Sequence, residues 1–190
     1  AGSACALKCV DQGFKTLLLE KAGRNRHKVC GGIAPKVCRD LIETELGLRI
    51  PTSVMASPNP LGLYYVPPSG KMNGGAMNNY WLLNLRRDSF DQWFRDEAER
   101  RKVKVLHGSE FLRFEAGEGT RILAKAADRP VTFETRYLIG ADGALSRVRS
   151  QLFPNSQLGV VTIMQEAWKA VGELGNYFYA FFREEVSQGY

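Results

Sequence analysis

The chain has 190 residues, 44% of them hydrophobic and 24% charged, and its formal net charge is +6. This composition is typical of a globular protein and excludes a disordered chain. The basic residues are scattered and no helix-turn-helix, zinc finger or aromatic-basic platform is present, so no nucleic-acid partner is expected. No apolar run is long enough to span a bilayer.

The chain has four cysteines, and their spacing bears on metal binding and on the redox compartment. No two of them form a C-x-x-C pair, so neither a zinc ribbon nor any other bound metal is predicted. Free cysteines fit a reducing compartment, so we expect a cytoplasmic protein.

The first fifty residues alternate between helical and strand patterns. Apolar residues at helical spacing predict a helix over 3–12, which Gly13 ends. The short apolar run 15–20 predicts a buried strand. A glycine-containing loop follows, and then a second helix over 35–46, which Gly47 ends.

The middle of the chain begins with a stretch rich in Pro, Gly, Ser and Asn. Residues 51–79 are expected to form a loop or a few short strands, with 63–66 the best strand candidate. A strand over 80–85, an amphipathic helix over 89–101 and a strand over 103–106 follow.

The last third of the chain is rich in strand patterns. Residues 110–134 predict a three-stranded meander, and 137–140 a buried strand. A short helix is expected over 145–152. The β-branched and aromatic runs 160–169 and 177–183 predict two long strands, which would begin a second, β-sheet layer.

The chain opens with a pattern that fits part of a dinucleotide-binding fold. Ala1-Gly2-Ser3-Ala4 precedes the first helix, and Glu20 ends the strand that follows it. Gly2 stands where the third glycine of G-x-G-x-x-G would allow close packing of helix and strand. The helix N-terminus would face a pyrophosphate, and the Glu20 carboxylate would accept hydrogen bonds from ribose hydroxyls. The alternative is an ordinary helix–strand pair.

A second motif spans residues 137–149. The predicted strand ends at Gly140, Asp142 and Gly143 form a tight turn, and a helix follows. Asp142 would fix hydroxyl or water positions near a diphosphate, and Arg147 and Arg149 would balance phosphate charge. The alternative is an Asp-Gly turn that only caps a helix.

These motifs resemble those of a known family. Residues 140–149 read G-A-D-G-A-L-S-R-V-R and resemble the second signature of flavoproteins related to p-hydroxybenzoate hydroxylase. Residues 28–32 read K-V-C-G-G and resemble the K-x-C-G-G element of geranylgeranyl reductase-like flavoproteins, while 87–91 match their R-x-x-F-D element. The resemblance covers nearly all of the chain, in the family's order.

The resemblance implies a set of FAD-binding residues. Ala1 and Gly2 would lie at the diphosphate and Glu20 at the adenosine ribose, while Phe111 would make a backbone contact to adenine. The full implied set is Ala1, Gly2, Glu20, Lys28, Cys30, Gly31, Gly32, Arg87, Phe111, Asp142 and Gly143.

Cys30 is the one catalytic candidate. The resemblance places Cys30 and Gly31 beside the flavin, where the thiol would donate a proton. The alternative is a buried cysteine that acts as a small apolar side chain. The aromatic residues at 177–182 would line an isoprenoid pocket, although alternation along a strand leaves half of them to sheet packing.

The fold class implied is α/β. A Rossmann-like FAD-binding domain with an inserted β-meander would occupy 1–155, and a β-sheet substrate domain would begin at 156–190, with 51–79 as a further candidate for the substrate domain. The first strand and the first two fingerprint glycines are missing, so we expect a chain truncated at both ends that is inactive by itself and binds FAD weakly. Residues 188–190 resemble the start of the family's aromatic segment at the substrate site.

The resemblance implies an FAD-dependent oxidoreductase that reduces carbon–carbon double bonds of a polyprenyl, geranylgeranyl-type substrate. NAD(P)H or ferredoxin would supply electrons, and the small-molecule or lipid-like substrate would bring the protein to the periphery of a membrane. One alternative is an FAD-dependent monooxygenase or halogenase; another, from a different class, is a non-catalytic dinucleotide-binding fragment. The sequence does not predict an oligomeric state.

Overall fold

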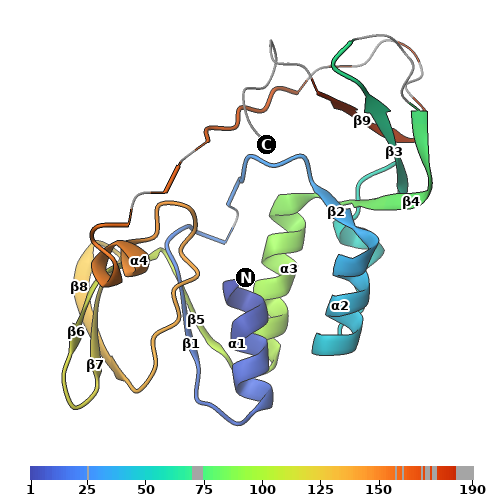
Figure 1. Cartoon of the computed structure of the whole chain (residues 1–190). Coiled ribbons are helices and arrows are strands. Elements are labelled where there is room, and N and C mark those ends of the chain that lie inside the picture. Colours follow the sequence, from blue (N-terminus) through green and yellow to red (C-terminus); the bar gives the residue numbers. More distant parts are fainter. Residues whose placement is uncertain are drawn as a thin grey trace. The chain divides into compact units, whose positions relative to one another are not determined.

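The computed structural model divides the chain into two compact units (Figure 1). Unit 1 comprises Ala1–His27 and Asp91–Val160, and unit 2 comprises Lys28–Phe90 and Val161–Tyr190. The residues that the structure describes are 1–24, 26–69, 75–156, 158–159, 161–167, 169, 172 and 175–182. Residues 188–190, with their predicted substrate-site segment, lie outside this set. Among the described residues, no helix is both long enough and apolar enough to cross a bilayer.

Unit 1 begins with a helix and a parallel pair of strands. Helix α1 (Gly2–Asp11) and strand β1 (Leu17–Glu20) confirm the first two predicted elements. β1 pairs in parallel with β5 (Lys104–His107), so that Glu20 lies beside His107 at the carboxyl end of both strands. β1 was expected to be buried, but all four of its residues are half-buried. The reason is that β5 is its one strand partner within the described part of the chain.

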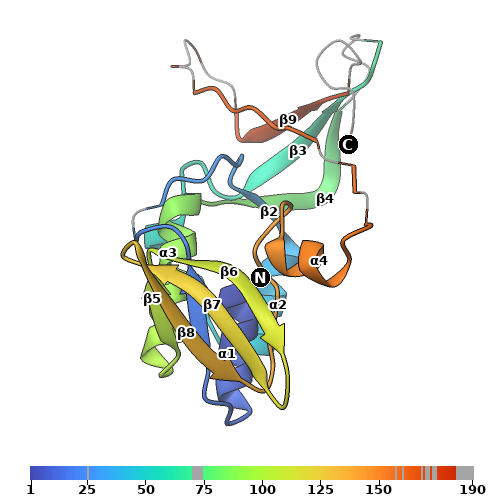
Figure 2. The ribbon, with the colours of Figure 1, turned by 90° about the vertical axis from the view of Figure 1, so that its left-hand side faces the viewer.

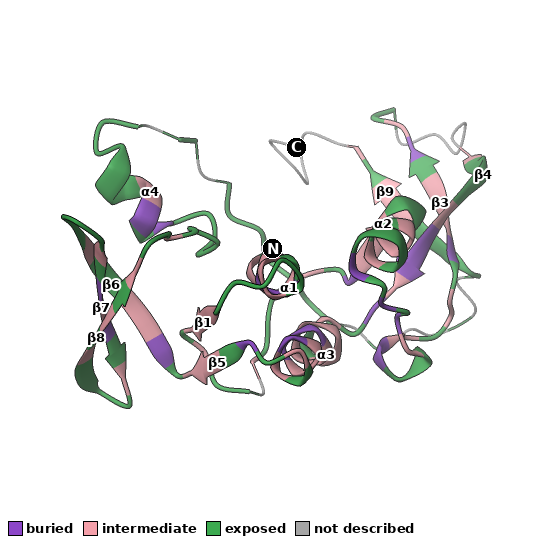
Figure 3. Ribbon diagram, turned by 90° about the horizontal axis from the view of Figure 1, so that it is seen from below, coloured by how far each residue is buried: buried purple, intermediate pink, exposed green. Residues whose placement is uncertain are grey.

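The predicted meander is confirmed (Figure 2). Strands β6 (Ser109–Ala116), β7 (Thr120–Ala126) and β8 (Arg129–Thr135) form an antiparallel sheet in the order β6-β7-β8. Burial alternates along β7 and β8, as expected when one face of a sheet is covered (Figure 3). Pro130 lies in β8, an edge strand, where the missing N–H of proline is tolerated.

The predicted buried strand over 137–140 is wrong. These residues form no strand in the structure, and the side chains of Tyr137 and Ile139 are 69% and 57% exposed. A strand forms only where a neighbour accepts its ladder of hydrogen bonds, and among the described residues no strand pairs with this segment. The helix that follows, α4 (Arg147–Leu152), is shorter than predicted because Ser146 caps it, with its Oγ accepting from Arg149 N at 3.0 Å.

Unit 2 is built on a four-stranded mixed sheet. Its strands are β2 (Ile33–Pro35), β3 (Leu61–Val66), β4 (Gly75–Asn84) and β9 (Tyr177–Phe181), in the order β2-β4-β3-β9. Neighbouring strands are antiparallel except for β3 and β9, which run parallel. The pairing of β3 with β9 joins part of the 51–79 stretch to the end of the chain.

Helices and loops complete unit 2. Helix α2 (Lys36–Leu46) ends at Gly47 in a left-handed conformation, as predicted, and a 3₁₀ turn η1 (Thr52–Val54) follows. Helix α3 (Arg87–Arg100) begins in unit 2 and continues into unit 1. The buried apolar residues of unit 2 include Leu46, Leu48, Ile50, Val54, Leu61, Leu82, Leu83 and Leu85.

The predicted long strand over 160–169 is also wrong. Residues 161–167 form no strand, and Ile163 and Met164 are 78% and 86% exposed. β-branched composition favours a strand only where a sheet edge is available to pair with it, and the described residues offer none here. The second predicted strand is confirmed as β9, which ends at Phe181.

Gly32 makes a close backbone contact that positions the loop before β2. Its φ of 72° lies in the left-handed region, and its carbonyl oxygen accepts a hydrogen bond from Leu85 N at 2.7 Å. A Cβ at this position would clash with the carbonyl oxygen of Leu85. Both the conformation and the contact therefore require glycine.

We expect Gly32→Ala to destabilise the protein by at least about 2 kcal/mol, because it combines left-handed strain with a backbone clash. Gly31→Ala is the matched control, since the atom nearest to an added Cβ there is on Ile33 at an ordinary 3.7 Å. Urea unfolding of both variants measures the difference. Equal stability of the two variants would contradict this account.

Candidate functional site

The start of α1 has the features of an anion-binding helix end. Gly2 packs closely: a Cβ there would lie 3.3 Å from Leu18 Cδ1 on β1 and 3.4 Å from the Cβ of Ala141. Within the part of the chain that the structure describes, no side chain caps the helix, and its first turn holds no acidic residue. The first N–H groups of the helix are therefore able to donate to a phosphate. This fits the predicted place of Ala1 and Gly2 at a diphosphate, which stays a prediction.

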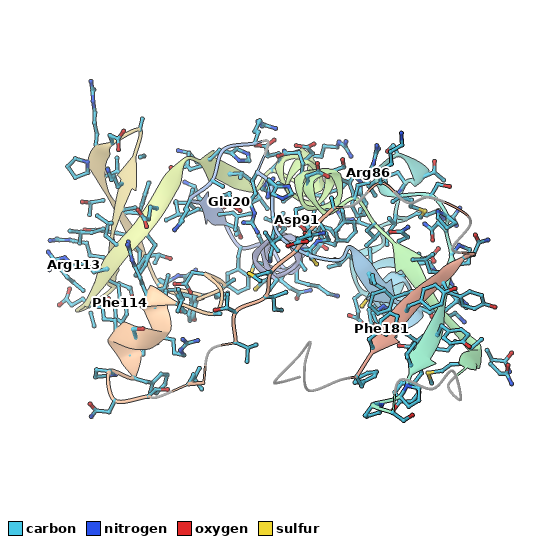
Figure 4. All side chains as sticks on the ribbon, turned by 90° about the horizontal axis from the view of Figure 1, so that it is seen from above. Glu20, Arg86, Asp91, Arg113, Phe114 and Phe181 are labelled. Atoms are coloured by element: carbon cyan, nitrogen blue, oxygen red, sulfur yellow. The ribbon has the colours of Figure 1, made fainter. Side chains whose placement is uncertain are left out.

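Glu20, labelled in Figure 4, lies at the carboxyl end of β1, and both oxygens of its carboxylate have partners. Oε1 accepts a hydrogen bond from Ala22 N at 3.0 Å. Oε2 lies 3.1 Å from Arg26 Nη1 and 3.5 Å from Arg95 Nη1. Helix α1 begins at the edge of the sheet where β1 ends, so Glu20 and Gly2 share the edge at which open α/β sheets bind their ligands.

Arg95, on α3, is a charged side chain that is only 3% exposed. Its Nη2 donates to Gln92 Oε1 at 2.8 Å and to the carbonyl oxygen of Arg24 at 3.1 Å. A buried guanidinium is tolerated when a carboxylate balances it, and Glu20 does so here. Arg95 was not among the predicted site residues, because α3 meets the end of β1 only in the folded chain. Arg26, in the loop six residues after Glu20, was not predicted either.

The basic loop that follows β1 is neutralised by acidic residues of α3. Arg24 Nη2 donates to both carboxylate oxygens of Glu99, at 2.8 and 2.7 Å. Arg24 Nη1 donates to Asp96 Oδ1 at 3.1 Å. Arg26 lies between Glu20 and Asp91, the latter at 3.7 Å. These pairs raise the pKa of the Arg24 guanidinium, mainly through its hydrogen bonds with Glu99. The loop is therefore a set of ion pairs rather than an open cationic patch.

Asp142, in the second motif, caps helix α4. Its Oδ1 accepts from Ser146 Oγ at 2.5 Å, and its Oδ2 accepts from the backbone N of Arg147 at 2.7 Å and of Val148 at 3.2 Å. Burial acts to raise the pKa of Asp142, but these hydrogen bonds outweigh it and hold the pKa below the usual value. Asp142 thus caps helix α4, which is the alternative interpretation to cofactor binding. The cofactor-binding role of Asp142 and Gly143 stays a prediction.

Helix α4 also holds the outer edge of β6. Arg147 Nη1 donates to the carbonyl oxygen of Phe111 at 2.9 Å, and Arg147 Nη2 pairs with Glu110 at 3.1 Å. The Gln151 amide group brackets Phe114, accepting from its N at 3.1 Å and donating to its O at 2.6 Å. Phe111, which is predicted to contact adenine through its backbone, therefore already uses its carbonyl within the protein.

In unit 2 the structure brings Cys30 and Arg87 together. Arg87, at the start of α3, donates from Nη1 to Cys30 Sγ over 2.9 Å. The side chain of Gln165 brackets the backbone of Cys30, accepting from its N at 3.0 Å and donating to its O at 3.1 Å. Cys30 is half-buried, whereas Lys28 and Gly31 are exposed. Gln165 was not predicted, because it lies 135 residues from Cys30 in sequence.

An apolar hollow of about 470 Å³ lies on one face of the β3-β4-β9 sheet. Its lining is Leu63, Tyr65, Gly75, Ala76, Met77, Ala180 and Phe182. Tyr177 and Tyr179 instead contact Tyr64, with ring centroids 5.9 and 5.2 Å from it. Of the aromatic residues at 177–182, the lining thus includes Phe182, which follows β9, while Tyr177 and Tyr179 pack against Tyr64 instead.

The sequence was then compared with known families and curated proteins. Residues 2–179 match the model of a family described as the FAD binding domain. The chain belongs to this family of FAD-binding domains. This FAD-binding domain is 31% identical over 183 residues to the geranylgeranyl diphosphate reductase of Rhodobacter capsulatus, covering 93% of the chain and 43% of that protein. It is 28% identical to protein CbrA of Escherichia coli over the whole chain and 52% of CbrA. The chain thus spans about half the length of the curated relatives it matches.

Solved structures agree with the α/β flavoprotein fold. A geranylgeranyl bacteriochlorophyll reductase-like protein from Thermoplasma acidophilum superposes with a TM-score of 0.64 and 24% identity, over 75% of this chain and 36% of that one. The flavin-dependent halogenase CmlS superposes with a TM-score of 0.62 and 17% identity, over 80% and 29%. Aklavinone-11 hydroxylase, solved with FAD, gives a TM-score of 0.59 and 15% identity, over 80% and 32%. At these identities the likeness concerns the fold, which is the one predicted.

The capping role of Asp142 predicts a pH-dependent stability. Its pKa is lowered in the folded protein, so ionised Asp142 stabilises the fold above the ordinary Asp pKa of about 3.9, and this contribution is lost as pH falls toward the folded-state value. We expect Asp142→Ala to destabilise this FAD-binding domain by about 1 kcal/mol at about pH 7 and by much less at about pH 3.

Urea unfolding at the two pH values measures this effect, with Glu118→Ala on the exposed β6–β7 turn as the control. A loss of stability in Asp142→Ala that stays the same at both pH values would refute the capping account.

The Gln165 bracket predicts local protection of Cys30. We expect Gln165→Ala to speed hydrogen exchange of the Cys30 amide by about tenfold, because its one described acceptor is removed. Gln151→Ala is the matched control, since it removes the same type of bracket from Phe114. Amide exchange measured by NMR distinguishes the two. Unchanged exchange at Cys30 in Gln165→Ala would show that the bracket is not formed in solution.

Proposed function

We propose that the protein is an FAD-dependent oxidoreductase that reduces carbon–carbon double bonds of a polyprenyl, geranylgeranyl-type substrate. The observation that carries the proposal is the match of 93% of the chain to the geranylgeranyl diphosphate reductase of Rhodobacter capsulatus at 31% identity. The K-x-C-G-G loop at 28–32 supports the same subgroup.

The residues of unit 1 fit the adenosine diphosphate half of FAD. The uncapped start of α1 offers N–H groups to phosphate, and Glu20, at the same edge, offers a carboxylate to ribose hydroxyls. The close packing of Gly2 against Leu18 keeps the helix start near that edge. We assign Ala1, Gly2 and Glu20 to FAD binding on this basis.

Reduction of a double bond requires a hydride at one carbon and a proton at the other, and the chemistry that reduced FAD supplies when bound is the hydride. We assign the proton to Cys30. Arg87 fixes the position of its sulfur, and Gln165 fixes its backbone. Because Arg87 donates to the sulfur, the S–H bond of the thiol is left to point elsewhere.

The apolar hollow on the β3-β4-β9 sheet supports a hydrocarbon substrate. Leu63, Met77 and Phe182 contribute apolar side chains to the lining, and Gly75 and Ala76 leave space in it because their side chains are absent or small. A prenyl chain has no hydrogen-bonding groups, so its binding depends on burial of apolar surface. We place part of the substrate chain here.

An FAD-dependent monooxygenase or halogenase is the second candidate. It is favoured by the structural likeness to CmlS and to aklavinone-11 hydroxylase. Such enzymes would act on aromatic or polyketide substrates, for which a polar cradle or a catalytic lysine would be expected. The described residues that line the hollow include neither. A non-catalytic dinucleotide-binding protein is the candidate of a different class, and bound flavin that never turns over would identify it.

The proposal extends to the partners of the reaction. NAD(P)H or ferredoxin would reduce the flavin, and a lipid-like substrate would be reached from a membrane surface at the cytoplasmic side. Each is tested separately, by flavin reduction with each donor and by binding to vesicles that carry the substrate.

The test is the visible absorption spectrum of the complete natural protein. We expect flavin bands that bleach on anaerobic reduction and return when a geranylgeranyl substrate is added, because electrons then pass to the double bond. Bands that return only with oxygen would favour the monooxygenase or halogenase. Absence of flavin, even after incubation with FAD, would overturn the proposal.

A further inference from the structure

We infer that Arg95 is a positioning residue for Glu20, holding its carboxylate in the orientation that binds the adenosine ribose of FAD. The inference rests on the proposed FAD binding and adds a residue that no motif of the sequence indicates. Arg95 does not itself contact the ribose; it acts through Glu20.

The first support is the burial of the ion pair. The Arg95 side chain is 3% exposed and that of Glu20 is 17% exposed, with Arg95 Nη1 and Glu20 Oε2 3.5 Å apart. A guanidinium this deeply buried needs a nearby negative charge, and a carboxylate beside it is held where that charge is required. Glu20 is the more exposed of the two side chains, so it is the one that a ligand can reach.

The second support is that Arg95 is itself fixed. Its Nη2 donates both to Gln92 Oε1, at 2.8 Å, and to the carbonyl oxygen of Arg24, at 3.1 Å. The guanidinium is planar, so fixing one nitrogen fixes the direction of the others. Arg95 therefore holds the Glu20 side chain and the loop after β1 with the same rigid group.

The third support is that Glu20 keeps acceptor capacity for a ligand. A carboxylate can accept about four hydrogen bonds. Oε1 accepts from Ala22 N at 3.0 Å and from Arg26 Nη1 at 3.3 Å, and Oε2 accepts from the same Arg26 nitrogen at 3.1 Å. The 3.5 Å separation of Oε2 from Arg95 Nη1 is that of an ion pair. Oε2 can thus still accept from a hydroxyl. A ribose hydroxyl is such a donor, whereas a 2′-phosphate would be repelled by the carboxylate.

The test compares FAD with its analogue in which the adenosine 2′-hydroxyl is absent. The complete natural protein is freed of flavin, and the affinity for each compound is measured by quenching of flavin fluorescence. We expect Arg95→Lys to weaken FAD about tenfold, equal to about 1.4 kcal/mol, and to leave the analogue nearly unchanged. The preference for FAD over the analogue would therefore fall. A merely structural role of Arg95 would weaken both compounds equally.

A double-mutant cycle then separates Arg95 from Glu20. We expect Arg95→Lys to have almost no further effect on FAD affinity in a Glu20→Gln background, because its effect passes through the carboxylate. Arg101→Lys is the matched control: Arg101 follows α3 in the same unit and pairs with Asp11 at 2.8 Å instead. If Arg95→Lys fails to fold, Gln92→Ala loosens Arg95 without changing its charge and should reduce the same preference.

The outcomes are distinguishable. An unchanged preference for FAD in Arg95→Lys, or additive losses in the double mutant, would overturn the inference while FAD binding by the wild type still supported the proposed function. No FAD binding by the wild type would overturn the proposed function and the inference with it.

Discussion

The buried ion pair between Arg95 and Glu20 joins helix α3 to the end of strand β1. Its guanidinium comes from α3 and its carboxylate from the end of β1, 75 residues earlier in the chain. Because the guanidinium is 3% exposed, α3 cannot move away from β1 without leaving a charge unpaired in a low-dielectric interior. Glu20 ends β1 at this contact, so the position of its carboxylate depends on an electrostatic contact as well as on apolar packing.

Side-chain amides have a second structural role: they form hydrogen bonds with backbone groups that none of the described strands pairs. Gln151 brackets Phe114 on the outer edge of β6, and Gln165 brackets Cys30 in the loop before β2. Each amide donates one hydrogen bond and accepts one, as an adjacent strand would. An unpaired strand edge invites pairing with another chain, and an unpaired loop amide leaves the backbone free to move. In both places a glutamine side chain fixes the backbone as a neighbouring strand would.

The sequence pattern correctly predicted the elements that depend on interactions between residues near one another in sequence. The helices α1, α2 and α3 and the meander β6-β7-β8 follow from apolar spacing and from turn residues such as Gly13 and Gly47. The failures at 137–140 and 161–167 share one cause: apolar, β-branched composition indicates a strand, but the partner strand decides whether one forms. The residues of the candidate site likewise fall into those that a local motif indicates and those that only the folded chain brings together. Glu20 and Cys30 stand in short motifs, whereas Arg95 and Gln165 reach them from 75 and 135 residues away and leave no periodic signal.

Asp142 shows why a structural and a functional interpretation of one residue need not exclude each other. Its carboxylate accepts from Ser146 and from two backbone amides of α4, and these donors hold its pKa low and keep it ionised. A charge fixed in this way is also an orienting group for any hydroxyl or water that approaches, because it cannot rotate or take up a proton easily. Gly143 follows it with a φ of 90°, and a Cβ there would have no neighbour within 4 Å. Capping therefore fixes the geometry of the turn, and the predicted cofactor-binding role of Asp142 and Gly143 is compatible with it.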